Sequence, residues 1–116
     1  MILVIGSLAS GKTEYVKTLG YSDSDIADGV LDGRPVLDNL QDLIFADPAG
    51  ADRLFSLLTN KEVVICAEVG SGVIPIESGA REAREAVGRL CIRLANEAER
   101  VVRLVCGIPT LIKGDR

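Results

Sequence analysis

Several residue types are scarce in this 116-residue sequence, which has no histidine, no tryptophan, two tyrosines and two phenylalanines. Its net charge at pH 7 is −4. Surfaces that bind nucleic acids are usually basic and often stack bases on aromatic rings, so this composition argues against a nucleic-acid partner. A chain of this length corresponds to one domain with a single core. Apolar residues make up 47% of the sequence, which indicates a folded protein.

Metal-binding and membrane-spanning patterns are also missing. The three cysteines, Cys66, Cys91 and Cys106, form no C-x-x-C pair, and without histidine a structural zinc site is not expected. No apolar run reaches the length of a membrane span, and the run from Met1 to Ile5 lacks the basic start of a signal peptide. We therefore expect a cytoplasmic protein with reduced, buried thiols.

Strand-like and helix-like segments alternate along the sequence. Apolar runs predict strands over 2–5, 36–37, 62–67 and 101–105, the last run being the final strand. Helical patterns cover 11–19, 38–46, 47–58 and 79–98, and an acidic loop with room for a helical turn covers 21–34. This alternation predicts an α/β fold with a mainly parallel sheet of about four to five strands and helices on both faces.

The stretch GSLASGKT, from Gly6 to Thr13, matches the phosphate-binding pattern G-x-x-x-x-G-K-[ST] at every fixed position. It lies between a predicted strand and a predicted helix, as a P-loop does, so we expect a three-layer domain like those of P-loop NTPases. Lys12 is expected to reach the β- and γ-phosphates, and the Thr13 hydroxyl to hold Mg²⁺. The predicted ligands are therefore ATP or GTP with Mg²⁺, and the residues predicted to bind them are Gly6, Ser7, Ala9, Ser10, Gly11, Lys12 and Thr13.

Two acidic residues at strand ends are candidates for chemistry beside this loop. Glu68 follows a predicted buried strand, where it could hold Mg²⁺ through water or accept a proton from an attacking hydroxyl, as a catalytic partner of Lys12. Alternatively, Glu68 caps the glycine-rich loop that follows it. Asp38 is the second candidate metal ligand, and it is equally well explained as a helix N-cap.

Two other charged segments are weaker candidates for functional sites. The acidic stretch from Asp23 to Asp28 does not fit a calcium loop, because its third acid is one place late and Arg34 stands where a bidentate glutamate belongs. We interpret that stretch as a solvated loop. Arg81 and Arg84, early in the long helix, could clamp phosphates or belong to a solvated ion-pair face.

The second half of the sequence resembles a known family. EVGSGVIP at 68–75, the helix that starts with Ala80 and Arg81, and VCGIP at 105–109 resemble the bifunctional adenosylcobinamide kinase/adenosylcobinamide-phosphate guanylyltransferases of cobalamin synthesis. That family carries E-V-G-x-G-x-V-P, then A-R-x-F-R-D-x-x-G-R-x-N-Q, then G-x-P, and the register holds without a gap from Glu68 to Pro109. The resemblance implies an oligomeric P-loop enzyme that phosphorylates adenosylcobinamide, with Glu68 near the metal or the substrate hydroxyl.

The sequence also departs from that family. It is several dozen residues shorter, and the loss falls between Gly20 and Pro35, where the family carries the histidine that is guanylylated. Without histidine, guanylyl transfer by that route is not expected. Ala83 replaces the family's phenylalanine, and Cys91 with Ile92 replaces its Asn-Gln pair. Three functions remain open: a small-molecule kinase, a nucleotide-binding module without turnover, and a structural subunit that acts through a homo-oligomer or a partner.

Overall fold

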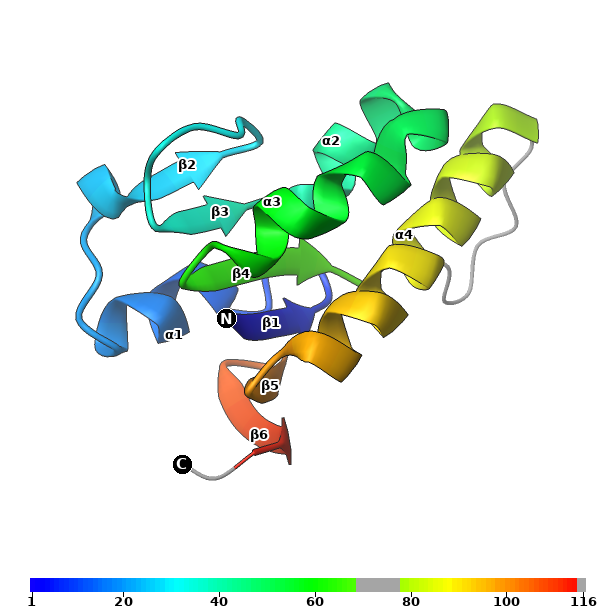
Figure 1. Cartoon of the computed structure of the whole chain (residues 1–116). Coiled ribbons are helices and arrows are strands. Elements are labelled where there is room, and N and C mark those ends of the chain that lie inside the picture. The colour runs from blue at the N-terminus through cyan, green and yellow to red at the C-terminus, as the bar shows by residue number, and fades with distance from the viewer. Residues whose placement is uncertain (69–77, 115–116) are drawn as a thin grey trace.

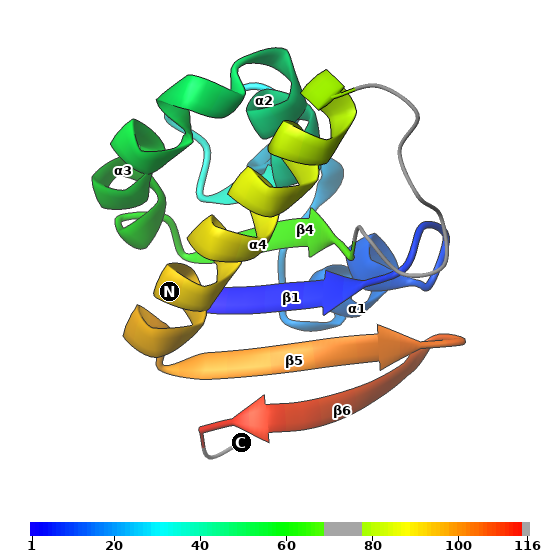
Figure 2. The same cartoon turned by 90° about the vertical axis from the view of Figure 1, so that its right-hand side faces the viewer.

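The computed structural model describes residues 1–68 and 78–114, which form one six-stranded sheet with helices on both of its faces (Figures 1 and 2). The strands are β1 (Ile2–Gly6), β2 (Ile26–Asp28), β3 (Val36–Asp38), β4 (Val63–Ala67), β5 (Arg100–Val105) and β6 (Ile108–Lys113). The α-helices are α1 (Lys12–Thr18), α2 (Leu40–Ala46), α3 (Phe55–Thr59) and α4 (Ser78–Glu97), and the 3-10 turns are η1 (Asp23–Asp25) and η2 (Pro48–Leu54).

The sheet has the order β2-β3-β4-β1-β5-β6, and all neighbouring strands are parallel except β5 and β6. The prediction of a mainly parallel, three-layer α/β fold of the P-loop type is confirmed. In a parallel sheet of this kind, the carboxyl ends of the strands meet at one edge, where loops can form a site. The segments after β1, β3 and β4 therefore start close together.

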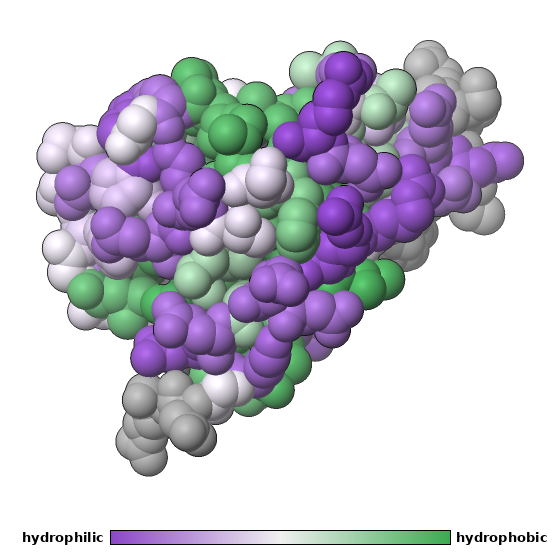
Figure 3. Space-filling view, in the orientation of Figure 1, coloured by the Kyte–Doolittle hydropathy of each residue, from purple (hydrophilic) through white to green (hydrophobic). Residues whose placement is uncertain are grey.

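The larger apolar core lies on the face covered by α2, η2, α3 and α4, which Figure 2 shows above β1 and β4. Leu3 and Val64 from the strands are buried there with Leu90 and Leu94 from α4. The helical spacing of apolar residues over 79–98 predicts this buried side of α4. On its opposite side, visible in Figure 3, hydrophilic side chains follow the helix, and Arg89 pairs with Glu85 at 4.0 Å.

The smaller core lies on the other face, which α1 covers alone. Val16 of α1 is buried against Val4 and Val102, because alternate side chains of a strand point to opposite faces of the sheet. Tyr15 and Tyr21 are partly buried at the margin of this core. Among the described residues, this one short helix does not extend over the outer part of this face, toward β6 (Figure 1).

Two strands were not predicted. β2 lies inside the predicted acidic loop, after the helical turn η1, and with three residues it is too short to show an alternating pattern. β6 follows β5 through a two-residue turn, in which Cys106 and Gly107 have φ values of 50° and 76°. Positive φ at both central residues is typical of the tight turns that join antiparallel strands. The same turn leaves Cys106 exposed, which contradicts the expectation that all three thiols are buried.

Two helix starts also differ from the prediction. Asp38 belongs to β3, and the N-cap of α2 is Asn39 with a φ of 58°, so the N-cap interpretation of Asp38 is wrong. The predicted helix over 47–58 is a 3-10 turn followed by the short α3. Gly50, in its first turn, disfavours α-helix, and a 3-10 turn is common at such starts. Among the described residues, no helix is long and apolar enough to span a membrane.

Candidate functional site

The segment GSLASGKT connects β1 to α1 as a tight loop at the carboxyl edge of the sheet. Ala9 and Gly11 have φ values of 58° and 93°, so the backbone turns back on itself twice within the loop. A side chain at Gly11 would be strained by that φ, and its Cβ would lie 3.1 Å from the Cα of Gly107. Such alternating backbone conformations turn successive N–H groups toward a common centre that suits an anion.

Lys12 lies at the start of α1 with its side chain folded into the loop. Its exposed fraction is 8%, and its ammonium donates a hydrogen bond of 2.6 Å to the carbonyl oxygen of Ser7. Burial lowers the pKa of Lys12, whereas the neighbouring charges of Asp38 and Glu68 raise it. Both candidate acids are therefore within electrostatic reach of this ammonium.

The loop also contains a buried hydroxyl and lines a cavity. Ser10 is 4% exposed, and among the described residues its Oγ has no hydrogen-bond partner. A cavity of about 200 Å³ opens here. Its lining consists of the residues from Leu8 to Thr13 together with Asp38 and Asn39. The hydroxyl lies against Gly6, since a Cβ built on that glycine would lie 2.5 Å from Oγ, and an unpaired buried hydroxyl costs stability.

Of the two candidate acids, Asp38 lines this cavity together with Thr13. It ends β3 opposite Asp28, which ends β2. Burial raises the pKa of Asp38, while the backbone N–H of Asn39, 2.8 Å from its Oδ1, lowers it. Within the ranges that the structure describes, no group of three or more His, Cys, Asp or Glu side chains could hold a metal ion by itself.

Glu68 lies behind the loop and is held by a residue that the sequence interpretation missed. Arg103 of β5 donates from Nε to Oε1 at 2.6 Å and from Nη2 to Oε2 at 3.1 Å. The backbone N–H of Glu68 donates to the carbonyl oxygen of Gly6 at 2.8 Å, which fixes the end of β4 beside the loop. The sequence feature that could have indicated this role is that Arg103 is the single arginine in the otherwise apolar stretch VVRLV. EVGSGVIP continues from Glu68 into residues 69–77, which lie outside the described residues.

Hydrogen bonds through the side-chain amides of Asn39 and Gln41 join three strand ends around the site. The sequence interpretation did not predict them. Asn39 donates to Asp28 at 2.5 Å and accepts from the Gln41 amide at 3.0 Å. The Gln41 side-chain oxygen accepts from the backbone N–H of Ala67 at 3.0 Å. Gln41 is buried, and its side-chain oxygen accepts the hydrogen bond that a neighbouring strand would otherwise accept from Ala67 at the end of β4.

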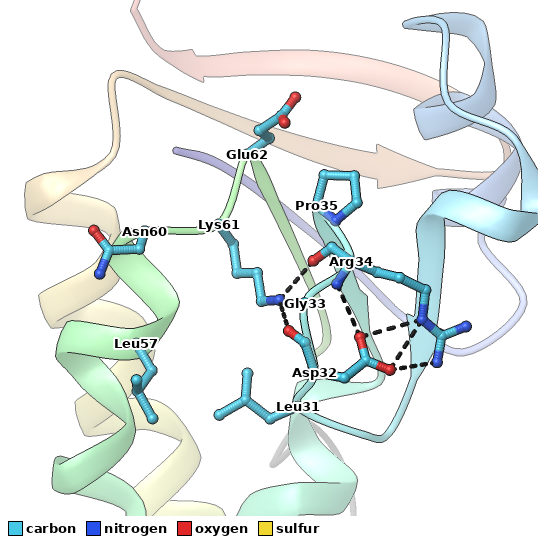
Figure 4. A pocket seen from close by; sticks show the side chains of 9 residues that line it. All are labelled: Leu31, Asp32, Gly33, Arg34, Pro35, Leu57, Asn60, Lys61 and Glu62. Atoms are coloured by element: carbon cyan, nitrogen blue, oxygen red, sulfur yellow. Dashed lines mark hydrogen bonds and ion pairs between the residues drawn. The ribbon is translucent and has the colours of Figure 1, made fainter.

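Another cavity lies elsewhere, at the amino ends of β3 and β4 (Figure 4). Its volume is about 600 Å³. Lys61 donates there to the carbonyl oxygens of Asp32 and Arg34, and Arg34 pairs with the Asp32 carboxylate at 2.7 Å. These polar groups are engaged within the protein, and the cavity is at the edge of the sheet opposite the loop. It therefore offers no evident ligand chemistry.

The predicted arginine pair lies on α4, where Arg81 is exposed and Arg84 is half-buried. Both alternatives for these two residues, phosphate clamp and ion-pair face, stay predictions.

Taken together, the strand, the phosphate-type loop, the following helix and the parallel sheet define a P-loop-type α/β protein. The chain belongs to the family described as cobinamide kinase / cobinamide phosphate guanyltransferase, whose sequence model matches residues 46–112, more than half of the chain. The matched region includes Glu68, α4 and Arg103, whereas the loop from Gly6 to Thr13 precedes it. No individual curated protein matches the chain.

Proposed function

We propose that this protein is a small-molecule kinase that binds ATP or GTP with Mg²⁺ at Gly6–Thr13 and phosphorylates a hydroxyl of an adenosylcobinamide-like acceptor. The observation that carries the proposal is the tight loop itself, in which the buried Lys12 lines one cavity together with Thr13 and Asp38. Membership of the cobinamide kinase / cobinamide phosphate guanyltransferase family supports the acceptor class.

Each residue of the site has a role in this proposal. The Lys12 ammonium leaves the Ser7 carbonyl and binds the β- and γ-phosphates. Thr13 and Asp38, which line the same cavity, would hold Mg²⁺ between them and the phosphates, and the ion would neutralise charge on the phosphate oxygens. Glu68 accepts the proton of the acceptor hydroxyl, or orients a water on the metal.

The reaction transfers one phosphoryl group. The acceptor oxygen attacks the γ-phosphorus, the bond from the γ-phosphorus to the bridging oxygen breaks, and a nucleoside diphosphate leaves. The proton of the acceptor hydroxyl passes to the Glu68 carboxylate. Transfer of GMP through a histidine is not part of this proposal, because none of the 116 residues is histidine.

Titration calorimetry with ATP and GTP in the presence of Mg²⁺ tests the proposal. Wild type should bind, and Lys12→Ala should not. Lys17→Ala is a matched control, because Lys17 lies on the same helix but pairs with Asp23 at 2.7 Å. If wild type binds neither nucleotide, the proposal is wrong. Binding without turnover of adenosylcobinamide would instead show a nucleotide-binding module.

A second candidate function, a structural subunit acting through self-association, is favoured by the hairpin of β5 and β6. This hairpin exposes large apolar side chains at Val105, Ile108, Leu111 and Ile112. Exposed apolar clusters of this kind often mark contact surfaces. Self-association and kinase activity are compatible, so the oligomeric state has to be measured separately.

A further inference from the structure

Two cysteine thiols meet between β4 and α4. Cys66 of β4 is 1% exposed and belongs to the larger apolar core, and Cys91 of α4 packs against the same core from the helix. Cys91 follows the buried Val87 by one helical turn, so both lie on the side of α4 that faces the sheet. A hydrogen bond joins the two thiols. The fold therefore brings together two sulfur atoms that are far apart in the sequence.

The two thiols differ in access. Cys66 is buried, whereas Cys91 is only half-buried. The hydrogen bond with Cys66 lowers the pKa of Cys91, although burial raises it. The thiol of Cys66 has a second acceptor in the carbonyl oxygen of Ala67, at 3.5 Å. A small oxidant can thus reach Cys91 first, and Cys66 is then the neighbouring thiol that can react with the oxidised sulfur.

We propose that Cys66 and Cys91 are an oxidation site of this protein, at which a peroxide converts the two thiols into a disulfide. The Cys91 sulfur attacks one peroxide oxygen, the O–O bond breaks, and the other oxygen leaves with the thiol proton as water. Cys91 then carries a sulfenic acid, and the Cys66 sulfur attacks the Cys91 sulfur. The S–O bond breaks, the S–S bond forms, and the sulfenic oxygen leaves with the Cys66 proton as a second water. The two sulfur atoms are oxidised and the peroxide is reduced.

The disulfide would join α4 to the central part of the sheet. Cys66 pairs with Ile5 of β1, directly before the loop that starts at Gly6, and it precedes Glu68 by two residues. A cross-link between distant positions restricts the unfolded chain and so favours the folded state. The oxidised protein should therefore unfold at a higher urea concentration than the reduced protein. This inference is independent of the proposed function, because it needs neither nucleotide nor acceptor.

The test treats Cys106→Ser with hydrogen peroxide, since Cys106 is exposed and would otherwise react by itself. This variant changes no core residue. Thiol titration in denaturant should show the loss of both remaining thiols, and dithiothreitol should restore them. Peptide mapping without reductant should find one linked pair of peptides, which contain Cys66 and Cys91. Urea unfolding of the oxidised and reduced forms should show the expected shift of the midpoint.

Two further variants in the Cys106→Ser background test the order of reaction. In Cys66→Ala, Cys91 should gain oxygen as a sulfinic acid, which mass spectrometry detects and dithiothreitol does not reverse. In Cys91→Ala, the buried Cys66 should keep its thiol. Absence of the linked peptides from peroxide-treated Cys106→Ser, or thiol loss that dithiothreitol does not restore, would overturn the proposal. Oxidation of Cys66 in Cys91→Ala as fast as in Cys106→Ser would also overturn it, because the peroxide would then not enter at Cys91.

Discussion

The pairing of Glu68 with Arg103 makes one carboxylate dependent on one guanidinium. Two nearly parallel hydrogen bonds restrict both the position and the rotation of the carboxylate. We predict that Arg103→Gln lowers kcat about tenfold, since a displaced catalytic group loses much of its effect. In a Glu68→Gln background, the same Arg103→Gln change should have almost no further effect on kcat, because its target is already gone.

Steady-state kinetics on the four proteins of this cycle measures the coupling. Arg34→Gln is the control, since it breaks a similar pair with Asp32 at the opposite edge of the sheet. It should leave kcat unchanged. Independent, additive losses from Glu68→Gln and Arg103→Gln would show that Arg103 acts on something other than Glu68.

Asp38 is expected to lower the free energy of unfolding, because its carboxylate is partly buried. Burial raises its pKa, so the folded protein holds this proton more tightly than the unfolded chain does. Stability therefore falls as pH rises from the usual carboxyl value of about 3.9 through the higher folded-state pKa. Asp38→Asn removes this cost, and its amide oxygen can still accept the N–H of Asn39.

Urea unfolding at two pH values tests this expectation. At pH 7, Asp38→Asn should raise the free energy of unfolding by about 1 kcal/mol, a typical gain for one stabilising substitution. At about pH 3, below the usual carboxyl value, the difference should largely disappear. The variant should also bind ATP with Mg²⁺ more weakly. Lower stability of Asp38→Asn at pH 7 would mean that attraction to Lys12 outweighs burial.

At the level of elements, Gln41 connects the start of α2 to the end of β4. We predict that Gln41→Ala destabilises the protein by about 1–3 kcal/mol, because it leaves the buried N–H of Ala67 without an acceptor. Below the usual glutamate pKa of about 4.3, Gln41→Glu is neutral and keeps an oxygen that can accept from Ala67, so its cost there should be smaller. Chemical denaturation compares the two. Equal losses would show that packing, rather than the hydrogen bond to Ala67, sets the cost.

The elements that the sequence predicted are those with long or repeated patterns. Such patterns are the apolar run of β4, the helical spacing of apolar residues along the 20 residues of α4, and the motif of the loop from Gly6 to Thr13. β2 was missed because three residues carry no period, and the pairing that forms β2 comes from its neighbour β3. The roles of Gln41 and Arg103 depend on contacts 26 and 35 residues away in the sequence, which no local pattern can show.

At the scale of the whole molecule, the described helices cover the sheet unevenly. Four exposed apolar side chains lie on the hairpin at the β6 edge, the largest exposed fractions being 66% at Ile108 and 55% at Ile112. β6 is the edge strand of the sheet and all its residues are exposed, and an exposed edge strand can pair with another chain.

We therefore predict a homo-oligomer that associates through this hairpin. Sedimentation velocity over a range of concentrations should show association for wild type, and Ile108→Lys with Ile112→Lys should shift it to the monomer without loss of the folded signal in circular dichroism. Ile92→Lys is the matched control, because Ile92 is 65% exposed on α4, away from the hairpin. Dissociation by Ile92→Lys alone would place the contact on α4. Monomeric wild type at every concentration would remove self-association from the function of this protein.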